Sequence, residues 1–234
     1  AFEVAGSAIG MLVTSFDGRP IKAEGSPEHP DSLGALPAVA QASVLGLYDP
    51  DRSRRLVERS AGGEFARTWA DFDAAVRARS VAPGRGLAVL SEASSSPTLA
   101  WLRERFLGEL PEARWYEYEP ASRDAEREGM AVAFGRPLRL DPRLESARVL
   151  ACFDADPLFD HPAAMRLART FAERRAPSAD MLRLYVAEPA YTLTGGKADH
   201  RAAVAHGAIP AALAALGKAL VEHHGLELPA ELHA

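Results

Sequence analysis

Two polar loops contain the residue types that could do chemistry in this chain. One follows an apolar run and reads Asp-Ala-Asp, with carboxylates at Asp154 and Asp156. The other starts at Glu188 and ends in a glycine-containing, charged stretch, whose candidate residues are Lys197, Asp199, His200 and Arg201. A nucleotide cofactor needs donors for its phosphates. We therefore treat these seven residues as a candidate cofactor-binding site, and we assign no catalytic and no metal-ligating residue.

The acidic turn is a poor partner for phosphate, because two carboxylates at one strand end repel an anion. Together with Asp160 and His161, Asp154 and Asp156 could instead bind a divalent cation, since Asp-x-Asp offers two hard oxygen ligands. The alternative is a solvated turn in which Asp160 caps the following helix. We favour the solvated turn over the cation site.

The second loop combines flexible backbone with the densest basic set in this part of the chain. Gly195 and Gly196 permit left-handed backbone or a close approach by a neighbour. We expect Asp199, His200 and Arg201 to form a hydrogen-bonded network that fixes the loop. Two threonines in the same loop are predicted to form turns, Thr192 and Thr194.

The elements that must position these loops read as strand, helix, strand. Two apolar runs, Val149–Phe153 and Leu184–Val186, flank an amphipathic run from Pro162 to Arg175. This order and length predict a parallel βαβ unit with a right-handed crossover. Because Val149–Phe153 is almost wholly apolar, we expect it at the centre of the sheet.

The loops after parallel strands meet at one edge of the sheet. We therefore expect residues 154–160 and 191–201 to lie together there. The acidic turn should pair with Lys197, His200 and Arg201, which would lower the carboxylate pKa values and leave no net positive pocket. The sequence thus predicts a site closed by its own side chains.

Strands and helices alternate from Leu87 onward, which indicates an α/β fold with a Rossmann-like, mostly parallel sheet and helices on both faces. The break at residues 83–86 is the expected boundary. Residues 1–83 would form a small N-terminal β-hairpin and helical part, with Asp17-Gly18 as the hairpin turn. Residues 84–234 would form the Rossmann-like domain. The turn at residues 91–96 has serines and no glycine, so we expect helix capping there.

Composition narrows the classes of function. The 234-residue chain is 47% hydrophobic and 25% charged, with a net charge of -5, so it has no basic footprint for nucleic acid. Its one cysteine, Cys152, excludes an internal disulfide and a four-cysteine cluster site, and we expect a buried, inert thiol. No apolar run is long enough to span a membrane, and no signal peptide is visible. The abrupt start suggests a piece of a longer protein.

Several short motifs occur in a fixed order along the chain. They are EGSPEHPDSLG from Glu24, QASVLGLYDPDRS from Gln41, FDADP from Phe153 and YVAEPAYTLTGGKADHR from Tyr185. Together they resemble the molybdopterin oxidoreductase superfamily, and most closely the molybdopterin-oxidoreductase-like iron–sulfur subunit of bacterial alternative complex III. The resemblance covers most of residues 11–216 and is weakest over residues 114–143.

This resemblance carries expectations about cofactors and partners. In catalytic relatives the corresponding turns hold the guanosine end of the pterin cofactor, and the first turn carries a glycine and an asparagine. This chain has Asp154-Ala155-Asp156 there, so the resemblance implies a vestigial site. Iron–sulfur clusters would lie elsewhere in the parent protein. The resemblance further implies other subunits of a respiratory complex as partners, and a location on the periplasmic side of the bacterial cytoplasmic membrane.

Three functions follow from these features. The first is a non-catalytic scaffold domain of a quinol-oxidising iron–sulfur subunit, without a cofactor of its own. The second is a cofactor-binding fragment of a molybdopterin guanine dinucleotide oxidoreductase. The third is a free-standing nucleotide- or ligand-binding module, which lacks a glycine fingerprint. We favour the first, and we expect the purified chain to be colourless and free of metal.

Overall fold

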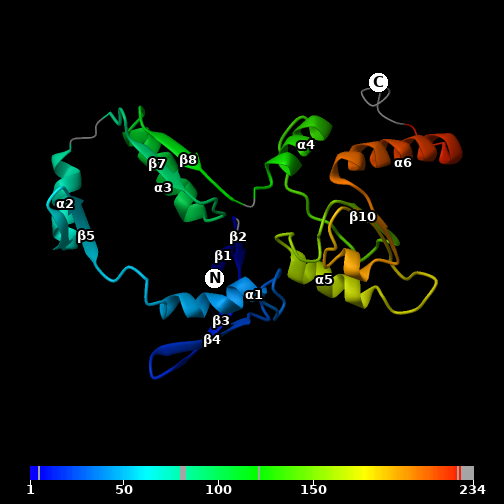
Figure 1. Ribbon diagram of the computed structural model, residues 1–234, viewed down its shortest axis with the longest axis horizontal. Coiled ribbons are helices and arrows are strands. Elements are labelled where there is room, and N and C mark those ends of the chain that lie inside the picture. The colour runs from blue at the N-terminus through cyan, green and yellow to red at the C-terminus, as the bar shows by residue number, and fades with distance from the viewer. Residues whose placement is uncertain (5, 80–82, 121, 226, 228–234) are drawn as a thin grey trace. The chain divides into compact units, whose positions relative to one another are not determined.

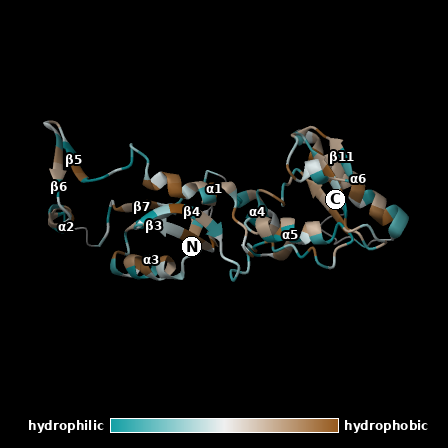
Figure 2. Cartoon of the chain, turned by 90° about the horizontal axis from the view of Figure 1, so that it is seen from below, coloured by the Kyte–Doolittle hydropathy of each residue, from teal (hydrophilic) through white to brown (hydrophobic). Residues whose placement is uncertain are grey.

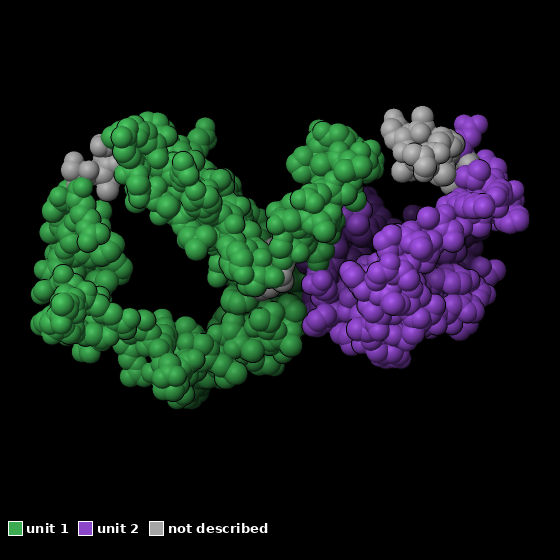
Figure 3. All heavy atoms as spheres, turned by 45° about the horizontal axis from the view of Figure 1, so that its top comes forward, with its two compact units in different colours: residues 1–139 green, residues 140–234 purple. Residues whose placement is uncertain are grey.

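The computed structural model describes residues 1–4, 6–79, 83–120, 122–225 and 227. It divides into two compact units, residues 1–139 and residues 140–234, which Figure 3 distinguishes by colour. Each unit is a mixture of short strands and helices, and the sheets in the described residues have two or three strands. The α/β class expected from the sequence is therefore confirmed at this level.

The first unit begins with two antiparallel strand pairs. Their strands are β1 (Phe2–Val4), β2 (Ser7–Ile9), β3 (Met11–Phe16) and β4 (Arg19–Gly25). The predicted turn joins β3 to β4, with positive φ at both Asp17 and Gly18. Helix α1 (Ala38–Ala42) begins directly after Pro37 and continues into the 3-10 helix η1 (Ser43–Leu47). A small core joins them, made of Ala23, Leu36, Ala40 and Val44.

A third hairpin and a helix follow in the first unit. The hairpin consists of β5 (Leu56–Ser60) and β6 (Gly63–Arg67), and the helix is α2 (Trp69–Ala78). Thr68 caps the helix and forms a capping box with Asp71, which satisfies backbone donors at the helix start. Apolar residues of this segment, such as Phe72 and Val76, remain exposed.

The last part of the first unit contains a parallel strand pair. β7 (Ala88–Ser91) and β8 (Arg114–Glu117) lie side by side, and α3 (Pro97–Glu109) connects them. Ser96 caps α3 and Pro97 occupies its first turn, as the serine-rich stretch predicted. Helix α4 (Asp124–Phe134) follows and ends at Gly135, whose backbone is left-handed.

The second unit contains a three-stranded parallel sheet. Its strands are β9 (Val149–Phe153), β10 (Arg183–Glu188) and β11 (His200–Ala203), in the order β11-β10-β9. Helix α5 (Ala164–Glu173) connects β9 to β10, which confirms the predicted parallel βαβ unit. The 3-10 turns η2 (Gly195–Lys197) and η3 (His206–Ala208) precede and follow β11, and the chain continues into α6 (Ile209–His224).

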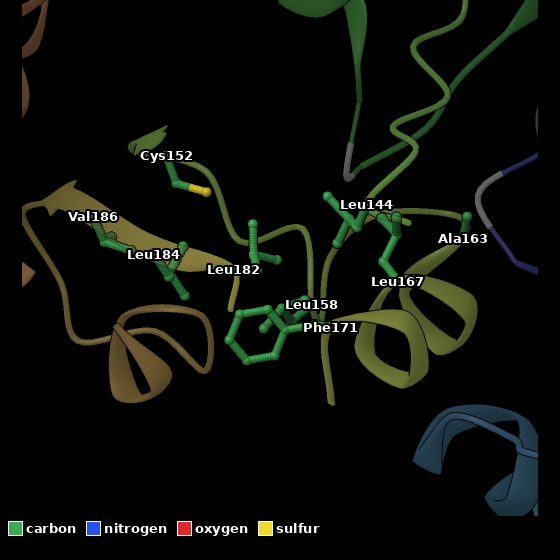
Figure 4. Close-up of a cluster of buried hydrophobic side chains, with 9 residues drawn as sticks. All are labelled: Leu144, Cys152, Leu158, Ala163, Leu167, Phe171, Leu182, Leu184 and Val186. Carbon is green, nitrogen blue, oxygen red and sulfur yellow. The ribbon is translucent and has the colours of Figure 1, made fainter. Parts of the chain in front are cut away.

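The core of this unit lies between the sheet and α5, as Figure 4 shows. Alternate residues of a strand point to opposite faces, so Leu184 and Val186 of β10 point into the core. Leu167 and Phe171, four residues apart on α5, meet them from the helix side. Cys152 is buried in the same cluster, as expected, and burial together with the charges of Asp156 and Glu188 raises its pKa to about 11.

The Rossmann-like, mostly parallel sheet is shown in part, because the described residues contain parallel strands in two separate sheets, one in each unit. The expected position of one strand needs correction. Strand β9 is an edge strand of its sheet rather than the central one, and Val149 is 60% exposed. Central position belongs to β10, whose core-facing residues are more deeply buried. An apolar run alone does not distinguish the two positions.

The units differ from the domains expected at residues 1–83 and 84–234, since they divide after Arg139. The expected division stays a prediction.

Many apolar side chains remain exposed, including Leu213 and Leu216 of α6, and Figure 2 shows the hydropathy of each residue. Among the described residues, no helix has the length and apolar character that crossing a bilayer requires.

The buried core makes a stability prediction. Leu184→Ala removes a fully buried side chain, so the free energy of unfolding should fall by about 2–5 kcal/mol in urea denaturation. Leu193→Ala in the same unit, where the side chain is 59% exposed, is the matched control and should change stability by about 0.5 kcal/mol or less. Equal losses in the two variants would contradict the packing described here.

Candidate functional site

The two polar loops meet at the carboxyl edge of the β9–β11 sheet, as predicted. Asp156 accepts hydrogen bonds from the backbone N–H and the hydroxyl of Thr194, at 3.0 and 2.5 Å. The Thr194 oxygen in turn accepts a bond from the N–H of Leu158 at 3.1 Å. Thr194 is fully buried, so these bonds join the loops beneath the surface. The threonine expected to form a turn therefore also holds the acidic turn in place.

The backbone N–H groups from Thr194 to Asp199 in the second loop all donate within the protein. The N–H of Thr194 donates to Asp156, and that of Gly195 donates to the Thr192 hydroxyl at 2.9 Å. The next three donate to carbonyls inside the loop itself, and the N–H of Asp199 donates to Leu184. Each of the six consecutive amides from residue 194 to 199 thus has a protein acceptor.

Glu188 lies at the end of β10 and is completely buried. Its carboxylate accepts a bond from the Arg201 Nε at 2.5 Å and another from the Thr192 hydroxyl at 2.6 Å. Burial pushes the pKa of Glu188 up, but the bonds from Thr192 and Arg201 outweigh it and hold that pKa below its usual value. A buried carboxylate needs such partners, because leaving it uncompensated costs several kcal/mol, roughly 3–5.

Gly195 is required by this buried carboxylate. A Cβ at position 195 would lie 1.9 Å from Glu188 Oε1, well inside van der Waals contact. A Cβ at Gly196 would lie 3.5 Å from Tyr191, which is an ordinary contact. Of the two glycines expected to allow a close approach, the first is the one that does so.

Asp199 is paired with Arg175 at the end of the α5 segment. The guanidinium donates two bonds of 2.7 Å to the two carboxylate oxygens, and the N–H of Leu184 adds a third at 2.8 Å. These bonds, with that of Arg175 the largest contribution, lower the pKa of Asp199 to about 2. The pair ties the start of β11 to β10 and to the helix, so its role is structural.

Asp154 lies at the exposed end of β9 with φ of 50°, a left-handed backbone that is uncommon for a residue other than glycine. Its N–H donates to the Ala187 carbonyl at 2.8 Å, and its carboxylate contacts His206 Nδ1 at 2.5 Å. The contact bridges β9 to the turn after β11, across the end of β10.

Of the remaining candidates, His200 and Lys197 are exposed and Arg201 is half-buried. His200 stacks on Tyr185, with ring centroids 4.9 Å apart, on the face of the sheet. The guanidinium of Arg201 lies 4.6 Å from the centre of the Tyr191 ring. Lys197 is exposed, and within the described part of the chain it makes no ion pair.

Several predicted contacts are wrong in detail. In the part of the chain that the structure describes, Asp154 contacts His206 and Asp156 accepts from Thr194, in place of the predicted cations. Arg201 pairs instead with Glu188 at the end of the adjacent strand. The network expected among Asp199, His200 and Arg201 is absent from the described residues, because alternation along β11 turns His200 and Arg201 to opposite faces. The partners found instead are Arg175, Thr192, Thr194 and His206.

The helix cap predicted at Asp160 is wrong, because helix α5 has Ala163 as its cap residue. The Nδ1 of buried His161 accepts the N–H of Ala163 at 3.0 Å. Asp154 and Asp160 are exposed, as a solvated turn requires. Arg175 and His206 had no sequence signal beyond their charge, because they lie outside both loops. Their contacts with the two loops can be recognised only in the structure, where the register of the strands brings these residues to the site.

The residues at this edge do not fit the phosphate groups of a pterin dinucleotide. The loop amides that could cradle a phosphate have acceptors within the protein, and the charge of Arg201 is balanced by Glu188. The carboxylates of Asp154 and Asp156 at the same edge disfavour an anion. The fold and site therefore define an α/β protein whose carboxyl edge is filled by its own polar side chains.

Comparison with known proteins adds a partial relative. No family model matches the chain. A stretch of 69 residues is 39% identical to the menaquinone reductase, molybdopterin-binding-like subunit of Nitratidesulfovibrio vulgaris. This stretch is 29% of the chain and 10% of that protein, so the chain matches only about a tenth of the relative's length. The match supports the molybdopterin oxidoreductase resemblance over that part of the chain.

The two glycines give a matched pair of variants. Gly195→Ala should lower the free energy of unfolding by about 1–3 kcal/mol, because the new methyl group must displace the buried Glu188 carboxylate. Gly196→Ala should change it by less than about 1 kcal/mol, since the space is open to a Cβ. Thermal or urea unfolding measures both, and a Gly195→Ala variant as stable as wild type would refute the close approach.

Asp199 predicts a pH dependence of stability. Its pKa is about 2 in the fold, against 3.8 for an unperturbed aspartate, so the folded state favours the ionised form. The resulting stabilisation is complete above the unfolded pKa and is lost as the pH falls from 3.8 towards about 2. The free energy of unfolding of Asp199→Asn, measured in urea, should therefore change less with pH across this window than that of the wild type. Identical profiles for variant and wild type would argue against the Arg175 pair.

Proposed function

We propose that this chain is a non-catalytic scaffold part of an iron–sulfur subunit in a membrane-associated, quinol-oxidising respiratory complex. It resembles molybdopterin oxidoreductases and holds no cofactor of its own. The single observation that carries the proposal is the set of six consecutive loop amides, from Thr194 to Asp199, that all donate within the protein. A phosphate-binding loop keeps such donors for its ligand.

Electrostatics at the same edge supports the proposal. Arg201 and Arg175 each neutralise a carboxylate of the protein, Glu188 and Asp199. A ligand phosphate would have to compete with both carboxylates, one of which is fully buried. Breaking a buried pair leaves an uncompensated charge, which is strongly destabilising. The edge is therefore better suited to holding the fold together than to exchanging a ligand.

The fold proposed for this scaffold is Rossmann-like, with a mostly parallel sheet and helices on both faces. Two βαβ units support it, β7–α3–β8 and β9–α5–β10. Val149, Tyr185 and His200, which point away from the α5 core, remain exposed. Parallel sheets are normally covered on both faces, so this exposed face also favours a fold with a second helical layer.

The partners and location proposed here rest on resemblance. The partial relative is named as a subunit of a menaquinone reductase, which favours other subunits of a respiratory complex as partners. By the same resemblance the chain would lie on the periplasmic side of the membrane, and iron–sulfur clusters would lie elsewhere in the parent protein. Its net charge of -5 gives no support to nucleic acid as a partner.

The second candidate function is a cofactor-binding fragment of a molybdopterin guanine dinucleotide oxidoreductase. The observation that favours it is a basic and aromatic group at the edge, made of exposed Lys197 and Tyr191 and of half-buried Arg201, which lies over the Tyr191 ring. A guanine base could stack on such a group. The name of the partial relative, a molybdopterin-binding-like subunit, is compatible with either candidate.

Titration with guanosine diphosphate separates the two candidates. A closed edge predicts no saturable heat in calorimetry and no thermal shift at micromolar nucleotide. Saturable binding that Arg201→Ala abolishes would overturn the scaffold proposal and favour the cofactor-binding candidate. Because Arg201→Ala leaves Glu188 unpaired, Lys197→Ala is the milder second variant, and loss of binding there carries the same conclusion.

Analysis of the full-length parent protein tests the wider claim. We expect iron and sulfide in the parent, no pterin, and no stoichiometric iron or molybdenum in this chain alone. Release of a pterin on denaturing the parent would contradict the proposal, because the carboxyl edge described here would then be the expected site of its guanosine end.

A further inference from the structure

The loop of residues 48–55, which follows η1, carries three arginines and is here called the arginine loop. Arg52, Arg54 and Arg55 are all exposed. In the part of the chain that the structure describes, their guanidinium groups form no ion pair and no hydrogen bond with the protein. The arginine loop therefore presents charged donors that no described residue of the chain uses.

A tight turn fixes the backbone of the arginine loop. The Oδ1 of Asp49 accepts the N–H of Asp51 at 2.8 Å, and the Asp49 carbonyl accepts the N–H of Arg52 at 3.2 Å. Pro50 restricts φ at the second position of this turn. The three arginines outnumber the two aspartates of the loop, so the loop keeps an excess of positive charge in a chain whose net charge is -5.

The arginines of the next hairpin, by contrast, are balanced within the chain. Arg59 pairs with Glu64 at 2.6 Å, and Arg67 pairs with Glu58 at 2.7 Å. The two arginines at the carboxyl edge of the second unit are also paired with carboxylates. At the arginine loop, a carboxylate from outside would displace no carboxylate of the described residues. The condition that argues against a phosphate at the carboxyl edge is therefore not met here.

An aromatic ring is held at the start of the arginine loop. The hydroxyl of Tyr48 donates to the Pro20 carbonyl, and the guanidinium of Arg19 lies 4.6 Å from the centre of the Tyr48 ring. Both contacts come from β4 and restrain the ring, which remains exposed. A restrained side chain loses little conformational entropy when a partner packs on it. Tyr48 is therefore suited to anchor a partner.

A hollow of about 510 Å³ connects this ring with the charges. Its lining is Leu47, Tyr48, Asp49, Arg52, Ser53 and Arg54. The first two supply exposed apolar surface beside the guanidinium groups. Tyrosine and arginine are among the residue types that contribute most of the binding energy in protein interfaces. This surface fits a partner that carries carboxylates next to an apolar side chain.

We propose that the arginine loop docks an acidic segment of another protein. Its carboxylates would bind Arg52, Arg54 and Arg55, and an apolar side chain would lie in the hollow against Tyr48. A guanidinium presents a planar pair of donors that matches a carboxylate, which a point charge does not. Extended polyanions fit less well, because the net negative charge of the chain repels them beyond the loop. The loop belongs to the first unit, so this docking is independent of what binds at the carboxyl edge of the second.

A peptide titration tests the docking. The probe is a short fluorescein-labelled peptide of glutamates with interspersed leucines, and fluorescence anisotropy follows its binding to the chain at low salt. The combined variant Arg52→Ala, Arg54→Ala, Arg55→Ala should bind the peptide at least about tenfold more weakly than wild type, which is about 1.4 kcal/mol. Because the three side chains are exposed, the variant should fold as wild type does, which circular dichroism checks.

The matched control removes the same charge from exposed arginines that have partners in the chain. It combines Arg59→Ala, Arg85→Ala and Arg105→Ala, each of which breaks a surface ion pair. This control should bind the peptide as wild type does. A peptide with serine in place of leucine should bind wild type more weakly, since it leaves the hollow without an apolar side chain.

Three results would overturn the docking surface. One is the absence of saturable peptide binding to wild type at low salt. Another is equal affinity of the two triple variants, because the charge of the chain rather than the arginine loop would then account for binding. The third concerns vesicles of phosphatidylglycerol. If wild type sediments with them, the arginine-loop variant does not, and the peptide fails to compete, the loop is a membrane contact and not a protein-docking surface.

Discussion

The buried carboxylate of Glu188 is the constraint on which the second unit depends. It lies at the end of the central strand and is held by Arg201 from β11 and by Thr192 from the following loop. Because a charged group without water needs several partners, the loop must curl back over it, and only glycine fits at position 195. The curl of the loop over Glu188 and the need for glycine at position 195 follow from this one requirement.

The function of this unit is therefore inferred from the hydrogen-bond partners of its polar side chains. Residue types alone suggested a cofactor edge, since basic, acidic and glycine residues gather in two loops. In the structure, Asp199 is hydrogen-bonded to Arg175, Asp156 to Thr194 and Glu188 to Arg201. In the first unit a carboxylate is used in the same way, because Glu3 of the N-terminal hairpin accepts a hydrogen bond from the Ser95 N–H just before helix α3.

The sequence predicted local structure better than it predicted which side chains pair with each other. The Asp17-Gly18 turn, the Ser96 cap and the parallel β9–α5–β10 unit depend on short-range rules, and each is present. The meeting of the two loops also followed, because parallel strands bring their carboxyl ends together. The side-chain partners of the loop carboxylates could not be predicted, because Arg175 and His206 are brought to the site by the register of the strands. The edge position of β9 was missed for the same reason.

The parallel pairing of β9 with β10 has a consequence for the order of folding. Hairpins such as β3–β4 close short loops and form within about 1–10 μs, whereas β9 and β10 must first enclose the whole of residues 154–182. The contact of Asp156 with Thr194 requires that enclosure to be complete, whereas Glu188 and Arg201 are closer in sequence and do not need β9. We therefore expect the Asp156–Thr194 contact to form late in folding and to slow unfolding more than it speeds folding.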